Sequence, residues 1–125
     1  MVFGIGVDIL EIEHFKKKFN SLKTRRSLNW LFTEEEIDYA EKNRRTENLA
    51  TTFAGKEAVL KALNLNLSKK NYFPEIIIKR DSSGKPYVFL KGSLAKKFPK
   101  SKYQIFISLS FESKTVIAFA ILEKV

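Results

Sequence analysis

No cysteine occurs among the 125 residues of this chain. The sequence therefore excludes a disulfide framework, a thiolate metal site and a cysteine nucleophile. Histidine occurs once, as His14, which excludes a metal centre built from several imidazoles. No apolar run approaches the roughly 20 residues of a membrane-spanning helix, and the N-terminus lacks the basic and apolar regions of a signal peptide. We therefore expect a cytoplasmic protein with no membrane partner.

The chain shows no internal repeat, linker or low-complexity tract, and its length suits one domain covering residues 1–125. Charge, in contrast, is abundant and unbalanced. Lysine and arginine number 23 and aspartate and glutamate 14, which gives a formal net charge of +9. Such an excess favours an acidic partner: nucleic acid, a phosphate-rich cofactor, a membrane surface or an acidic protein.

The hydrophobic patterns predict a mixed α and β fold. We expect strands at 3–9, 75–80 and 87–90, with a turn at 81–86, and a final antiparallel pair at 103–112 and 114–122. Helices are expected at 12–19, from 33 to about 43, from about 47 past 57, and as one or two turns at 93–98. Thr33 and Glu36 form a capping box at the start of the second helix.

Asp8 lies near the end of the first strand, on a face with little side-chain bulk. Side chains alternate between the two faces of a strand. We expect one face to point into the core, and it carries Phe3, Ile5, Val7 and Ile9. Gly4 and Gly6 share the other face with Asp8, and glycine inside a strand often marks close approach by a ligand or another backbone. A carboxylate on a cleared surface is thus one interpretation, and a solvated aspartate at a strand end is an equal alternative.

A second acid, Glu57, lies in a helix that is otherwise largely apolar. The helical period gives an apolar stripe of Leu49, Phe53, Leu60 and Leu63. Lys56 projects within that stripe, Glu57 lies on its flank, and Lys61 follows one turn later. Glu57 and Lys61 can simply form an i, i+4 pair worth a few tenths of a kcal/mol. Charges beside a core-facing stripe are expensive unless paired or liganded, however, so two such carboxylates indicate a site for a hard cation.

Other singular residues have ordinary explanations. We expect His14 on the surface and Trp30 in packing. Ser108 and Ser110 share one strand face, but no histidine is spaced to activate either as a nucleophile.

Five motifs, in this order, resemble the holo-acyl-carrier-protein synthase family of 4'-phosphopantetheinyl transferases. They are Gly4-Ile5-Gly6-Val7-Asp8-Ile9-Leu10-Glu11-Ile12, Phe53-Ala54-Gly55-Lys56-Glu57-Ala58, Lys61-Ala62, Gly84-Lys85-Pro86 and Ser108-Leu109-Ser110. The likeness covers nearly the whole chain. It implies an α+β, single-domain 4'-phosphopantetheinyl transferase-like fold, with an antiparallel sheet and packed helices. It also implies a homotrimer that holds coenzyme A between its subunits.

The resemblance implies a transferase of fatty acid biosynthesis. Coenzyme A would donate its 4'-phosphopantetheine arm to a serine of apo acyl carrier protein, releasing adenosine 3',5'-bisphosphate. The cofactor would be Mg²⁺, because Asp8 and Glu57 stand at the motif positions of its ligands. We count Lys61 with them as a catalytic residue. The sequence does not identify the general base, and the two candidates are a metal-activated water and Glu36.

We expect two further groups of contacts. Contacts to coenzyme A are expected from Lys56, Lys61, Asn64, Asn66, Lys85, Pro86 and Ser108. The acidic carrier protein is expected to dock on His14, Lys17, Lys18, Arg25 and Arg26. Steering by those charges should weaken with salt.

The chain also departs from the family pattern. His14 and Thr52 stand in place of arginines, Asn64-Leu65-Asn66 in place of a Gly-Thr-Gly turn, and Phe106 and Phe111 in place of histidines. These departures leave open a diverged member that binds coenzyme A or a carrier without turnover. A third hypothesis, a basic nucleic-acid-binding module, is motivated by charge alone. It has no recognisable motif and leaves Glu57 unexplained.

Overall fold

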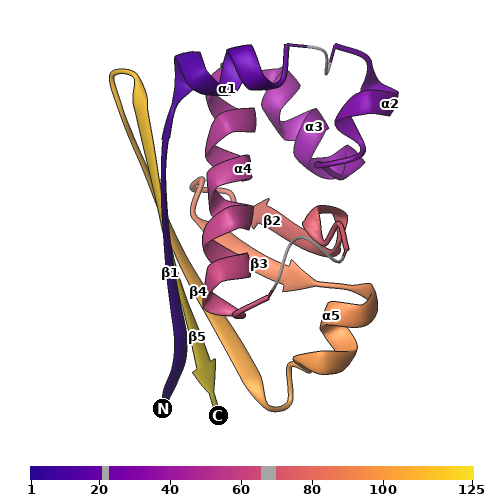
Figure 1. Cartoon of the computed structure of the whole chain (residues 1–125), viewed down its shortest axis with the longest axis vertical. Helices are drawn as coiled ribbons and strands as arrows, with labels where there is room; N and C mark the ends of the chain where they lie inside the picture. The colour runs from indigo at the N-terminus through magenta and orange to yellow at the C-terminus, as the bar shows by residue number, and fades with distance from the viewer. Residues whose placement is uncertain (21–22, 66–69) are drawn as a thin grey trace.

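The computed structural model describes residues 1–20, 23–65 and 70–125 (Figure 1). In chain order its elements are β1 (Val2–Glu11), α1 (Ile12–Lys18), α2 (Arg25–Leu28), α3 (Glu34–Lys42), α4 (Arg45–Ala62), the 3-10 helix η1 (Phe73–Glu75), β2 (Ile76–Arg80), β3 (Pro86–Leu90), α5 (Gly92–Lys97), β4 (Tyr103–Glu112) and β5 (Thr115–Lys124). The prediction of an α+β fold with an antiparallel sheet and packed helices is confirmed.

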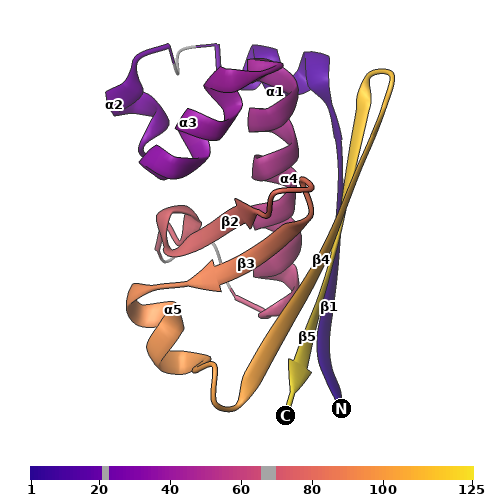
Figure 2. The same ribbon diagram turned by 180° about the vertical axis from the view of Figure 1, so that it is seen from behind.

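Helix α4 runs through the middle of the molecule. A three-stranded antiparallel sheet of order β1-β5-β4 lies along one side of it, and the β2-β3 hairpin crosses it on another (Figures 1 and 2). Helices α1, α2 and α3 gather at one end of the long axis, whereas α5 and both chain termini lie toward the other (Figure 1). The core therefore forms around α4 rather than between two sheets.

Small residues let α4 lie unusually close to the sheet. The inner face of β5 is buried and includes Ala118 and Ala120. On β1, a Cβ atom at Gly4 would overlap the carbonyl oxygen of Ala62, and one at Gly6 would overlap that of Ala58. The helix backbone fills the space beside these glycines. Of the two explanations for glycine inside a strand, a nearby ligand or a nearby backbone, the structure shows the second.

The other face of the sheet is exposed, and the prediction that it points into the core is wrong. On β1 the four side chains Phe3, Ile5, Val7 and Ile9 are between 53% and 68% exposed. They are joined by Phe106 of β4 and by Ile117 and Phe119 of β5. We call these seven residues the outer face. The reason for the reversal is steric, because only the glycine-bearing face admits a helix.

The helix signals are largely confirmed. The capping box of Thr33 and Glu36 is present at α3, with Thr33 donating from its N–H to Glu36 Oε1 at 2.9 Å. The single turn α2 and the 3-10 turn η1 were not predicted. His14 is exposed as expected, but Trp30 is 68% exposed, so its prediction as a packing residue is wrong. Within the described ranges, no helix combines the length and apolar character that crossing a membrane requires.

The contact between β1 and α4 gives a stability prediction. Gly6→Ala should lower the free energy of unfolding by about 3 kcal/mol, because the added methyl group meets helix backbone that has no room to move. Gly84→Ala is the matched control. Its Cβ meets open space, so only the left-handed φ of +88° opposes it, at about 1 kcal/mol. Urea unfolding of both variants makes the comparison, and equal losses would contradict it.

Candidate active site

Asp8 and Glu57 come together because β1 and α4 pack side by side. From Leu49 to Ala62 every residue of α4 is buried except Glu57 and Lys61. These two exceptions lie one turn apart, next to the end of β1 that carries Asp8. Lys61 Nζ reaches across to β1 and donates to the Val7 carbonyl at 2.9 Å and to Asp8 Oδ1 at 3.3 Å. Lys61 thus bridges the two elements that carry the acids.

The electrostatics of the acid pair favour a bound cation. Burial raises the pKa of Asp8, against the lowering effects of Lys61 and Lys18. Burial also raises the pKa of Glu57, and the negative charge of Asp8 raises it further. The neighbouring lysines therefore do not fully compensate the two carboxylates. A hard cation would offset the desolvation of the two carboxylates and would also reduce the repulsion between their negative charges.

The donor set fits a cation that keeps part of its coordination open. In the part of the chain that the structure describes, no group of three or more His, Cys, Asp or Glu side chains is placed to hold a metal. Two carboxylate oxygens with the remaining positions taken by water or phosphate oxygens is the arrangement that Mg²⁺ usually adopts in proteins.

Lys56 does not face this site, so the structure gives no support to the predicted contact from Lys56 to coenzyme A. Its side chain is fully buried, with Nζ 2.6 Å from Glu36 Oε1. The same ammonium donates to the carbonyls of Leu31 and Phe73 at 2.7 and 2.8 Å. Burial lowers the pKa of Lys56, while the Glu36 carboxylate raises it. The Glu36 carboxylate is buried in the same ion pair, so we exclude Glu36 as a candidate general base.

The other residues expected to contact coenzyme A are dispersed. Asn64 lies two residues after the end of α4 with φ of +56°, so it takes the left-handed conformation that glycine would otherwise supply. Asn66 lies outside the described residues. Lys85 and Pro86 lie at the turn of the β2-β3 hairpin. Ser108 is exposed on the outer side of the sheet, opposite Phe119 in the register and on the face that Asp8 does not share.

The expected carrier-docking residues fall into two groups. His14, Lys17 and Lys18 are exposed on α1, and the charge of Lys18 acts on both Asp8 and Glu57. Arg25 is bound to Glu34 at 2.7 Å and also to Asp38, so its charge is locally balanced. Arg26 is exposed on α2.

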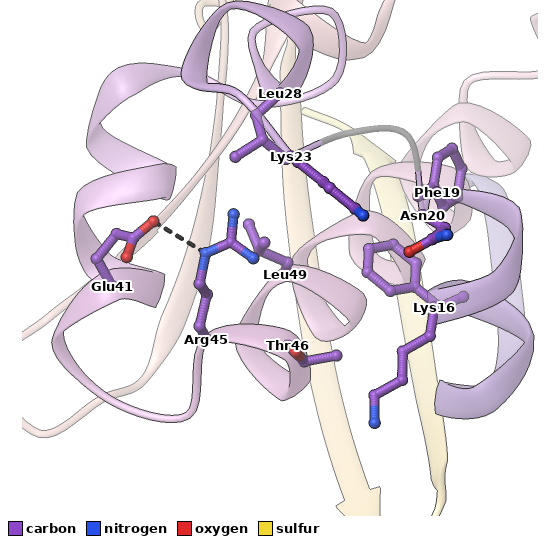
Figure 3. Close-up of a pocket in the computed structure, with 10 residues that line it drawn as sticks. Lys16, Phe19, Asn20, Lys23, Leu28, Glu41, Arg45, Thr46 and Leu49 are labelled. Atoms are coloured by element: carbon purple, nitrogen blue, oxygen red, sulfur yellow. Dashed lines mark hydrogen bonds and ion pairs between the residues drawn. The ribbon is translucent and has the colours of Figure 1, made fainter.

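Sequence reasoning missed a pocket beside these helices, which we call the aromatic pocket. Its volume is about 540 Å³. Four apolar side chains form part of its walls: Phe15, Phe19, Leu28 and Leu49. Three basic side chains also line it: Lys16, Lys23 and Arg45 (Figure 3). Arg45 is paired with Glu41 at 3.0 Å. The i, i+4 spacing of Phe15 and Phe19 indicates an apolar face on the helix, but the same spacing is equally typical of residues packed in a core.

Comparisons with known proteins show the family to which the chain belongs. Residues 4–120 match the model of the 4'-phosphopantetheinyl transferase superfamily, ACPS. A holo-[acyl-carrier-protein] synthase of Clostridium botulinum (strain Alaska E43 / Type E3) is 41% identical over 124 residues, which covers 98% of each chain.

Two known structures share the fold over nearly their whole length. The holo-[acyl-carrier-protein] synthase of Neisseria meningitidis superposes with a TM-score of 0.86 at 29% identity, covering 99% of this chain and 100% of that one. The ACPS–CoA complex of Chronobacterium ammoniagenes gives 0.83 at 26%, covering 97% and 96%. Because the family model matches residues 4–120, almost the entire chain, this protein is a member of the 4'-phosphopantetheinyl transferase superfamily.

Proposed function

We propose that this chain is a holo-acyl-carrier-protein synthase, with residues 1–125 acting as one domain. It transfers 4'-phosphopantetheine from coenzyme A to a serine of apo acyl carrier protein and releases adenosine 3',5'-bisphosphate. The observation that carries the proposal is the only partly compensated pair of Asp8 and Glu57, with Lys61 bonded to Asp8, at positions within the range that the family model matches. Relatives named as synthases, one of them in complex with coenzyme A, support the same reaction.

Asp8 and Glu57 would hold Mg²⁺ through one carboxylate each. When bound, the ion supplies neutralisation of the charge that develops on the pyrophosphate of coenzyme A. Lys61 is placed to hold a phosphate oxygen, since its side chain is 55% exposed although its Nζ lies 3.3 Å from Asp8. A phosphate oxygen beside Asp8 would be within reach of the same ammonium, which forms short charge-assisted hydrogen bonds to such acceptors. Asn64 supports the proposal by keeping the left-handed turn after α4.

We propose that the outer face is buried between copies of the chain in a homotrimer. Seven large apolar side chains on one side of a sheet form a patch of the kind that marks a protein interface. Ser108 gives a second argument. Ser108 lies on the outer face of the sheet, whereas Asp8 lies on the inner face. A coenzyme A molecule bound at Asp8 of one copy would therefore contact Ser108 of a neighbouring copy.

The carrier protein would dock over α1 and the aromatic pocket. An acidic helix with apolar anchors would match both the lysines at its edge and its phenylalanine and leucine walls. Lys18 extends this basic surface toward Glu57, so a docked carrier would deliver its serine close to the acid pair.

Asp8→Asn should abolish transfer without unfolding the protein. The substitution keeps the size of the side chain but replaces a carboxylate ligand by a neutral amide, which binds Mg²⁺ far more weakly. Its melting temperature should not fall, because burial raises the pKa of Asp8 and the substitution removes the negative charge that this burial destabilises. Chromatography of released adenosine 3',5'-bisphosphate measures the reaction, and circular dichroism measures the fold. Undiminished release by the variant would refute the metal assignment.

The docking surface predicts a separation of kinetic constants. Lys16→Glu with Lys23→Glu should raise KM for the apo carrier by roughly tenfold, since two attractive charges become repulsive. KM for coenzyme A should not change. Lys96→Glu with Lys97→Glu on α5 makes the same change in net charge at the other end of the molecule and serves as the control. Equal effects of the two pairs would mean that only net charge matters.

The proposed trimer is tested by one charge on the outer face. Ile5→Glu should convert the protein to monomers in sedimentation velocity, because the side chain is 62% exposed in the single chain and would be buried in the assembly. Tyr87→Glu alters an exposed aromatic side chain on β3 and should leave the assembly intact. A parent protein that sediments as a monomer would contradict the trimer.

A further inference from the structure

The proposed reaction makes no use of the most deeply buried charges in the described core. Glu36 of α3 and Lys56 of α4 form an ion pair of 2.6 Å, and neither side chain is exposed. A buried ion pair is weak evidence of a gain in stability, because the cost of desolvating both charges offsets their attraction. Its best-attested role is to select one arrangement among several packings of similar energy.

The pair makes directional hydrogen bonds to several parts of the fold. Lys56 donates to the Leu31 and Phe73 carbonyls as well as to Glu36. Glu36 accepts from the backbone N–H of Thr33 at 2.9 Å and from that of Ile78 at 2.8 Å. Through one ammonium and one carboxylate, α4 is therefore connected to the start of α3, to η1 and to β2.

Apolar burial alone specifies the rotation of α4 poorly. Residues Leu49 to Ala62 are buried on all sides of the helix apart from Glu57 and Lys61, so no single apolar stripe marks an inward face. Hydrophobic burial is also non-directional. A hydrogen bond weakens steeply when its angle departs from linearity, so the Lys56 contacts constrain rotation far more sharply.

The rotation of α4 decides where Glu57 points. Successive residues of a helix are separated by about 100°. With Lys56 fixed toward α3 and β2, Glu57 is turned toward β1 and Asp8, and Lys61 lies one turn further along nearly the same line. A small rotation of the helix would carry both residues away from Asp8 together.

We propose that Glu36 and Lys56 are positioning residues that set the rotation of α4 and thereby hold Glu57 and Lys61 against Asp8. The consequence for metal binding rests on the function proposed above, whereas the geometric consequence does not. Glu36→Gln with Lys56→Met removes both charges at nearly constant volume and avoids leaving one charge buried alone. Leu94→Ala is the matched control, because it opens a cavity in the core at α5, away from the acid pair.

The experiment uses the full chain and two readouts, at a temperature where circular dichroism shows every variant folded. Electron paramagnetic resonance measures the binding of Mn²⁺ as a probe of the acid pair. The nuclear Overhauser effect between the Gly6 α-protons and the Lys61 β-protons reports the seating of α4 on β1 without any metal, since Lys61 Cβ lies beside Gly6. The double variant should bind Mn²⁺ about tenfold more weakly and lose that Overhauser effect. Leu94→Ala should keep both properties.

Two outcomes decide the matter. A double variant that retains the Gly6–Lys61 Overhauser effect overturns the positioning role, whatever its affinity for Mn²⁺. A parent protein whose Mn²⁺ binding does not depend on Asp8 overturns the proposed metal site instead, and the Overhauser comparison still decides the role of Glu36 and Lys56.

Discussion

The contact of α4 with β1 is the constraint on which the rest of the structure depends. Gly4 and Gly6 leave no side chain between the strand and the helix, so the carbonyls of Ala58 and Ala62 approach the strand backbone directly. Only at that separation does Lys61 reach the Val7 carbonyl and Asp8. The same contact forces Phe3, Ile5, Val7 and Ile9 outward. A steric requirement inside one chain thus produces both the acid pair and the apolar outer face that we propose as a subunit interface.

The charged residues of α4 and its neighbours have two different roles. At the edge of α4, Asp8 and Glu57 remain under-neutralised, which is a useful state for a site that must take up a cation and phosphate. One residue earlier in the helix, Lys56 is paired with Glu36 and donates two further hydrogen bonds to backbone carbonyls. Adjacent residues of one motif therefore have opposite roles. The helix separates them by direction, sending Lys56 into the core and Glu57 toward β1.

The sequence predicted the order and type of most elements, because capping boxes, alternation and turn residues are local signals. It also singled out Asp8, Glu57 and Lys61, whose polarity conflicts with their surroundings and which the fold brings together. It failed where the answer depended on the third dimension. Which face of β1 is buried depends on helix residues more than 50 positions further along the chain, and Lys56 finds its partner in Glu36 on another helix. The aromatic pocket was missed for the same reason, because α1, α2 and α4 meet only in the folded chain.

The central claim is that Asp8 and Glu57 support Mg²⁺-dependent transfer of phosphopantetheine. Intact-mass spectrometry of an apo acyl carrier protein, incubated with this protein and coenzyme A, tests it most directly. The account predicts that the carrier gains the mass of one phosphopantetheine arm when Mg²⁺ is present and gains nothing when the metal is chelated. No gain with several apo carriers would contradict the transferase, and an undiminished gain under chelation would contradict the role given to the acid pair.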